Sequence, residues 1–256
     1  YKRQSQDGSD IVKTIDAHAP ADFTVGTVTT NGGTVKAGKW NSTNTDLDIT
    51  VPIAADDSLV GGKVQIQAGV DGNGYSDIGS AANIVQKDTN LAVNLLKADI
   101  AGLIGLTEGS VITFRAVMSD AAGNQKVGDP SATTLTFDET APEIDTITST
   151  GDAVGVLKIG GTIVFTLTPK TKAEPNGSAS GSYNGVALNW STADAGATYT
   201  ATYTVTEGDP DQTSALQITG VKLTDAAGNE SPAKDGTDIV KTIDANSPAS
   251  FTVGSV

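Results

Sequence analysis

Apolar and polar residues alternate along most of the chain in short runs that Gly, Asn, Asp and Pro separate. Alternation with a period of two places one face of a strand in a core and the other in solvent. The pattern therefore predicts an all-β protein with few helices. The predicted strands are 22–28, 46–53, 63–70, 111–119 and 132–138 in the first half, and 143–150, 162–169, 185–190, 198–205, 215–225 and 238–244 in the second.

Two segments interrupt this pattern. The apolar stretch 91–106 contains Lys97 and Asp99, which predicts a short helix or crossover loop over a core and excludes a membrane span. The sequence DGNG at 71–74 predicts a hairpin turn. The oxygen-bearing residues at alternate positions of 71–77 are also reminiscent of a calcium loop, but the distal bidentate Glu is missing, so the plain turn is favoured.

A long internal repeat predicts that the chain is part of a tandem array. The sequence DIVKTIDAHAPADFTVGTV at 10–28 returns as DIVKTIDANSPASFTVGSV at 238–256, with 15 of 19 positions identical at an offset of 228 residues. Neither segment is of low complexity, so chance is a poor explanation. Tandem arrays serve reach, display or binding more often than a single chemical step.

A shorter repeat divides the chain into domains. The sequence SDAAGN at 119–124 returns as TDAAGN at 224–229, and each copy precedes a connector of the form Asp to Pro. Three such connectors occur, at 15–20, 137–142 and 243–248. We therefore expect residues 1–16 to end a preceding repeat, residues 17–139 and 140–244 to form two domains, and residues 245–256 to open the next repeat.

Each predicted domain has roughly seven strands in roughly 105 to 120 residues, which is the proportion of a β-sandwich of two half-buried sheets. The late-strand (S/T)DAAGN motif and the linker Asp138, Thr140, Ala141 and Pro142 resemble the immunoglobulin-like tandem repeats of giant bacterial surface adhesins of the RTX type. The resemblance covers both domains. It implies tandem immunoglobulin-like β-sandwich domains arranged end to end. The other connectors depart from the motif and read DAHAP and DANSP.

Composition narrows the function further. The chain has no Cys, which removes disulfides, thiol catalysis and thiolate metal sites. It carries 30 acidic and 16 basic residues and a net charge of −14. Nucleic acid is therefore not expected as a partner, because phosphate binding needs clustered Lys and Arg. No apolar run reaches the length of a membrane span, so membrane insertion of this segment is not expected either.

The acidic connectors suggest calcium as a cofactor. Ca²⁺ takes six to eight oxygen ligands, and acidic residues on both sides of a linker supply them. We expect the loop after the late strand to approach the connector that leaves the same domain, and the resemblance implies that these residues bind calcium and stiffen the array. The alternative is that DAAGN is only a turn, in which Asp bonds backbone N–H groups and Gly takes a positive φ. The candidate ligands are Asp120, Asn124, Asp138, Glu139 and Asp145 for one site, Asp225, Asn229 and Asp244 for the other, and Asp16 in the first connector.

The remaining candidates favour structural roles. His18 is the only His, and the second copy of its repeat has Asn246 in its place, so a catalytic role is not expected. Trp40 and Trp190 are interpreted as core or strand-edge anchors rather than sugar platforms. Asn41 begins an N-x-S/T sequence that a Ser- and Thr-rich chain produces by chance, and the acids of the EGDPDQ loop are interpreted as solvated charges.

The sequence thus predicts a non-enzymatic stalk or extender segment of a secreted or surface-anchored bacterial adhesin, rigidified by calcium where domains meet. Its partners would be the neighbouring repeats of the same chain, with a surface glycan or protein ligand elsewhere in the full protein. Two alternatives stay open. One domain, rather the first, would be a carbohydrate- or protein-binding module, or the chain would be a subunit of a surface layer or filament.

Overall fold

The computed structural model describes residues 15–151, 155–171, 173–174, 176–237, 239 and 242–254. They form two compact units. The first contains the described residues up to Gly33 together with Asn44–Phe137, and the second contains Thr34–Thr43 and the described residues from Asp138 onward. The sequence pattern predicts residues 34–43 in the first domain and a boundary after Glu139. We call Thr34–Thr43 the covering segment, because it packs on a loop of the second unit. It contains the short strand β2 (Lys39–Trp40).

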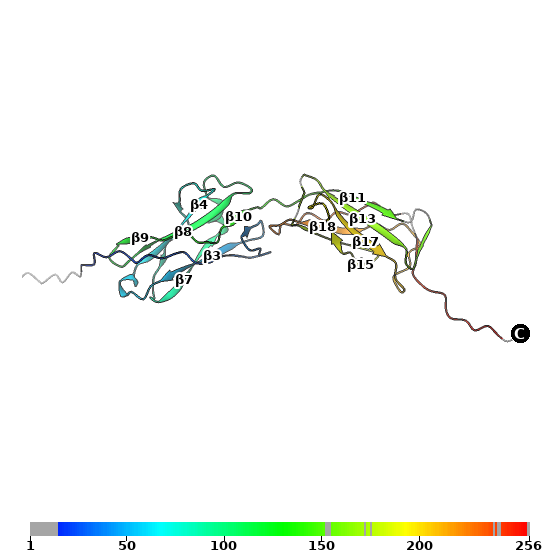
Figure 1. Cartoon of the computed structure of the whole chain (residues 1–256), viewed down its shortest axis with the longest axis horizontal. Coiled ribbons are helices and arrows are strands. Elements are labelled where there is room, and N and C mark those ends of the chain that lie inside the picture. Colours follow the sequence, from blue (N-terminus) through cyan, green and yellow to red (C-terminus); the bar gives the residue numbers. More distant parts are fainter. Residues whose placement is uncertain are drawn as a thin grey trace, which may run out of the picture. The chain divides into compact units, whose positions relative to one another are not determined.

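The first unit has two antiparallel sheets. One has the order β1 (Val28–Asn31), β3 (Asp46–Ile53), β7 (Thr89–Leu96). The other sheet contains, in spatial order, β10 (Leu135–Phe137), β8 (Val111–Ser119), β4 (Lys63–Val70) and β5 (Ser76–Asp77). Two short strands pair beside this row: β6 (Ala82–Asn83) with β4, and β9 (Gln125–Val127) with β8. A 3-10 turn (Asp57–Leu59) and the helix α1 (Lys97–Ala101) lie between strands. Figure 1 shows β4 and β8 on one side of this unit and β3 and β7 on the other.

The second unit repeats this plan. Its first sheet has the order β11 (Ile144–Gly151), β13 (Thr162–Pro169), β17 (Tyr199–Thr204), β16 (Trp190–Ser191). The second has β15 (Val186–Ala187), β14 (Ser178–Tyr183), β18 (Thr219–Thr224), and the bridge of Val221 with Lys234 extends it. The strand β12 (Val156–Lys158) runs parallel to β19 (Thr242–Asp244).

This strand order identifies both units as immunoglobulin-like β-sandwiches. In that fold the first, second and fifth strands share one sheet, with the fourth at its edge, while the third, sixth and last share the other. The orders β11-β13-β17-β16 and β15-β14-β18 match this arrangement. The prediction of an all-β, immunoglobulin-like fold is therefore confirmed.

Alternating burial along the strands builds each core. In β3 and β8 every second residue is buried, with Leu47, Ile49, Ile112 and Phe114 fully so. The corresponding core of the second unit forms around Phe165 and the tyrosines 183, 199 and 203. The ring centroids of Tyr183 and Phe165, and of Tyr183 and Tyr203, are 5.1 Å apart, a distance at which tilted and edge-on aromatic pairs attract each other.

Several local predictions are confirmed and one is half right. The DGNG turn joins β4 to β5, which pair antiparallel, with Asp71 and Gly72 at positive φ. Trp40 is fully buried, and Trp190 packs against the second core. The stretch 91–106 contains the expected helix at Lys97–Ala101, but its beginning is part of β7. No helix of the described residues is long and apolar enough to cross a membrane.

Candidate functional site: the two Asp-Ala-Ala-Gly-Asn loops

The two copies of the DAAGN sequence adopt the same turn. We call Asp120–Asn124 the first loop and Asp225–Asn229 the second loop. In the first loop the carboxylate of Asp120 accepts from the backbone N of Asn124 at 2.9 Å and from its Nδ2 at 2.8 Å. In the second loop the corresponding distances from Asn229 to Asp225 are both 2.9 Å. The glycine has φ of 95° in both loops, a conformation that strongly favours Gly.

The carboxylates at the start of these loops are buried. Asp120 and Asp225 are 3% and 4% exposed, and a buried charge persists only when hydrogen bonds or counter-charges compensate it. The hydrogen bond from the Asn124 side chain, with backbone N–H groups of the same loop, lowers the pKa of Asp120. Asp120 therefore forms the turn that its own loop's N–H groups complete, and calcium binding at this loop stays a prediction.

Each loop bonds to the connector that precedes its own domain. Asn124 Nδ2 donates to the backbone carbonyl of Asp16 at 3.1 Å. Asn229 Nδ2 donates to the backbone carbonyl of Asp138 at 2.9 Å and to its Oδ1 at 3.4 Å. The same donor thus meets the same acceptor in both units. In both units the Asn side chain therefore holds the backbone carbonyl of the connector's Asp against the sandwich.

The expectation that Asp120 and Asn124 approach Asp138 and Glu139 was wrong. Thr136 of β10 pairs with Val111 at the start of β8, whereas Asp120 follows the end of β8. At about 3.3 Å per residue, these two ends of β8 lie roughly 30 Å apart. The exit of the domain and its DAAGN loop are therefore at opposite ends of the sandwich.

The same correction applies to the second set. Asp225 follows the end of β18, while the chain that leads to Asp244 bridges back past Val221 and then Leu216 toward the opposite end of that sheet. Asp145, expected as a ligand, lies instead beside Lys234, which donates to its backbone carbonyl. The loops and connectors do form pairs, but each loop pairs with the connector before it.

The three connectors share one local structure. In each, the carboxylate of the leading Asp accepts from the backbone N two residues later, as an Asx turn. The distances are 3.0 Å from His18 to Asp16, 3.3 Å from Thr140 to Asp138, and 3.3 Å from Asn246 to Asp244. The departures from DxTAP in the first and third connectors therefore leave this turn intact.

The third connector is held by a loop that the sequence analysis had misjudged. Asp211 accepts from the backbone N of Ala245 and from Asn246 Nδ2, both at 2.8 Å, and Glu207 accepts from the backbone N of Ser247 at 3.1 Å. The hydrogen bonds from Ser247 lower the pKa of Glu207. Glu207 and Asp211 thus contact the connector, and Asp209 accepts from Thr206 and Tyr203 instead, so these acids are not free solvated charges. Their position directly after a predicted strand was the signal that could have indicated this.

The covering segment supplies the functional residues that sequence reasoning missed. Asn41 Nδ2 donates to the carbonyl of Ala227 at 2.7 Å. The backbone N and the Oγ of Ser42 donate to Asn229 Oδ1 at 2.9 and 2.7 Å. Trp40 Nε1 donates to Glu139 Oε1 at 3.0 Å. Asn41 was noticed only as the start of an N-x-S/T sequence, and its side chain is fully buried.

The arrangement does not by itself form a calcium cage. Both oxygens of Asp225 accept N–H donors, and the amide NH₂ of Asn229 lies between Asp225 and Asp138. Calcium requires converging oxygens, so an ion would have to replace these donors. Among the residues that the structure describes, no three acidic, His or Cys side chains come together as a metal site.

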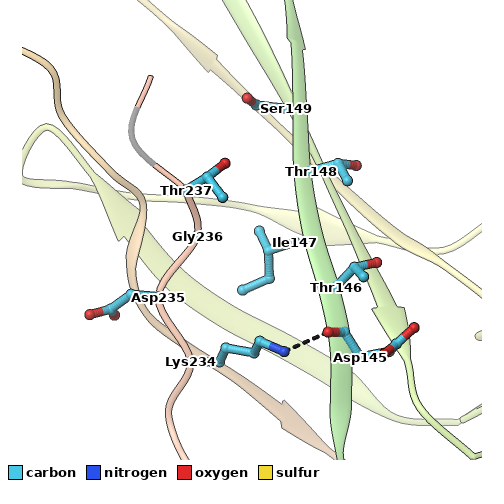
Figure 2. Close-up of a pocket in the computed structure, with 9 residues that line it drawn as sticks. All are labelled: Asp145, Thr146, Ile147, Thr148, Ser149, Lys234, Asp235, Gly236 and Thr237. Atoms are coloured by element: carbon cyan, nitrogen blue, oxygen red, sulfur yellow. Dashed lines mark hydrogen bonds between the residues drawn. The ribbon is translucent and has the colours of Figure 1, made fainter. Parts of the chain in front are cut away.

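The second unit also has an open groove with a volume of about 550 Å³ between the edge of β11 and residues 234–237. Figure 2 shows Ile147 and Thr237 directed toward this groove, with Lys234 bonded to the Asp145 carbonyl at one end. Its lining is Asp145, Thr146, Ile147, Thr148, Ser149, Lys234, Asp235, Gly236 and Thr237. These residues offer donors and acceptors but no aromatic ring on which a sugar could stack.

Comparisons with known proteins assign no function to this chain. No protein-family model and no curated protein matches the chain. A solved structure described as a marsupial T cell receptor has 8% identity and a TM-score of 0.43, over 85% of this chain and 74% of that chain. The ICAM-5 D1–D4 ectodomain fragment has 14% identity and a TM-score of 0.31, over 85% of this chain and 53% of its own.

Proposed function

We propose that this chain is a non-enzymatic spacer segment of an extracellular tandem array, of the kind that forms the stalk of a secreted or surface-anchored bacterial adhesin. The observation that carries the proposal is the repeated bond between a loop Asn and the carbonyl of the connector that precedes its domain. A spacer needs connectors with a fixed direction. This bond, with the Asx turn next to it, gives the connectors at Asp16 and Asp138 one preferred path each.

The energetic scale suits that role. A hydrogen bond contributes about 0.5–1.5 kcal/mol net, and the Asn side chain makes one such bond to the connector and a second to the buried Asp of its loop. Only the bond to the connector distinguishes connector conformations, and about 0.5–1.5 kcal/mol favours one of them by roughly two- to tenfold.

Calcium binding at these loops is the second candidate. It is favoured by the carboxylates that gather near each connector, where the buried Asp225 lies one Asn side chain away from Asp138. In this proposal the ion would draw on the carboxylates of Asp225, Asp138 and Glu139 and on backbone carbonyls. It would neutralise repulsion in a chain of net charge −14.

Two measurements on the full chain test the spacer proposal: solution scattering, and the width of the distribution of distances between two labelled positions. We expect a narrow distance distribution that broadens in the Asn124→Ala/Asn229→Ala double variant. The matched control is Asn90→Ala, an exposed position in β7. An equally broad distribution in all three proteins would contradict a spacer and would favour the binding-module or filament alternatives.

A further inference from the structure

The first and second loops have the same sequence and turn but very different surroundings. In the second loop Ala227 and Asn229 are 1% and 0% exposed. In the first loop the equivalent Ala122 is exposed, and Asn124 is only partly buried. A difference in burial between identical pentapeptides must come from what packs on them.

The covering segment accounts for this difference. It brings the Asn41 amide to the Ala227 carbonyl and the Ser42 backbone N and hydroxyl to Asn229 Oδ1. A methyl carbon of Thr34 also lies where a Cβ on Gly228 would come within 2.8 Å. Hydrogen bonds and close packing thus act together on the carbonyl edge of the second loop.

The first loop presents the same acceptors. The carbonyl of Ala122 and Oδ1 of Asn124 are equivalent to those of Ala227 and Asn229. Among the residues that the structure describes, no group donates a hydrogen bond to either acceptor. A Cβ on Gly123 would meet nothing within 4 Å. Buried peptide and amide acceptors need donors, so a partner that covers this loop must supply them in the same places.

We propose that the first loop is a docking surface for a second copy of the covering segment, carried by another copy of residues 17–138. This inference rests on the proposed array. The recognising chemistry is the set of donors at Asn41 and Ser42, together with the small apolar contact of Thr34. In the first loop, as in the second, the docked segment lies against the loop that holds the preceding connector.

The absence of Cys from the chain permits a direct test. Ala122→Cys provides one thiol at the exposed position, and its labelling rate by a maleimide is measured in two proteins. One is the full chain. The other carries a further copy of residues 17–138 directly before residues 17–256, so that Asp138 of the added copy replaces Asp16. Docking predicts at least tenfold slower labelling in the longer protein.

The matched control is Asn41→Ala/Ser42→Ala in the added copy only, which should restore rapid labelling. Hydrogen exchange of residues 120–126 in the same proteins without the thiol provides a second measurement. Equal labelling and exchange in all proteins would overturn the proposal. Slowing that survives the double substitution would also overturn it, because another surface would then cover the loop.

Scattering from the same proteins separates this inference from the spacer proposal. An extended particle with an unprotected first loop would refute the docking surface and leave the spacer standing. A compact particle with a protected loop would support the docking surface and refute the spacer.

Discussion

Replacing Asn229 by Ala should destabilise the second unit more than any other truncation in its loop. The Asn229 side chain is fully buried and makes four hydrogen bonds. Its Nδ2 donates to Asp138 O and Asp225 Oδ2, both at 2.9 Å. Its Oδ1 accepts from the N and Oγ of Ser42 at 2.9 and 2.7 Å. The substitution leaves a buried carboxylate oxygen and a backbone N–H without their partner. Each such group costs about 1–3 kcal/mol.

Because the groups relax in part, we expect a loss of about 3 kcal/mol. For a unit of this size that lowers the melting temperature by roughly 10 °C. Asn124→Ala is the matched comparison in the first loop. It removes the bonds to Asp16 and Asp120 but no contact with a covering segment, so about 1–2 kcal/mol is expected.

Urea unfolding followed by tryptophan fluorescence measures this loss, because Trp40 and Trp190 both belong to the second unit. Calorimetry of the full chain provides the value for the first unit. Asn90→Ala, at an exposed strand position, should stay within about 0.5 kcal/mol of the parent. If Asn229→Ala also stayed within that range, or cost no more than Asn124→Ala, the covering segment would contribute no stability.

Three further predictions address other features. Gly123 and Gly228 have the same φ of 95°, but only a Cβ on Gly228 would meet Thr34 at 2.8 Å. Gly123→Ala should therefore lower the free energy of unfolding by about 1–2 kcal/mol through left-handed backbone strain. Gly228→Ala should lower it clearly more, as measured in the same urea titrations. Hydrogen bonds, above all from the Thr198 side chain, lower the pKa of Asp194 from 3.8 to about 2. The stability that the Asp194 carboxylate contributes is therefore present above pH 3.8 and is lost as the pH falls toward 2, so Asp194→Asn should flatten the pH dependence of acid unfolding in that window. An unchanged pH dependence would contradict a contribution from Asp194. Calcium at a hundredfold excess over its Kd should stabilise the chain by about 2.7 kcal/mol relative to EDTA; superimposable melts, with magnesium as control, would remove calcium from the proposal.

The strands were the most predictable part of the molecule. The runs 46–53, 63–70, 111–119 and 162–169 coincide with β3, β4, β8 and β13, because a half-buried strand must alternate. The beginning of β7 was harder to recognise. Only its last residues include buried side chains, and the apolar residues continue past Lys97 and Asp99 of the helix that follows.

The site was only half predictable. The motif itself marked Asp120, Asn124, Asp225 and Asn229 correctly as a special loop, since an Asp-to-Gly-Asn turn has a local signature. Which connector the loop contacts depends on the direction of β8 across the sheet, which local sequence does not encode. The contact of Ser42 with Asn229 spans 187 residues, and no periodicity relates two such positions.

The Asx turn shared by the three connectors has a consequence for how such a protein changes over generations. Its geometry depends on a carboxylate and an N–H two residues apart, so the joint is copied whenever a repeat is copied. In the proposed tandem array, recombination between misaligned repeats would then lengthen or shorten the gene without the need for compensating mutations at the new boundary. The Asx turn itself uses only the backbone N of positions 18 and 246, which are His and Asn, although the Asn246 side chain also bonds to Asp211. The length of such an array would thereby become a trait that selection adjusts one repeat at a time.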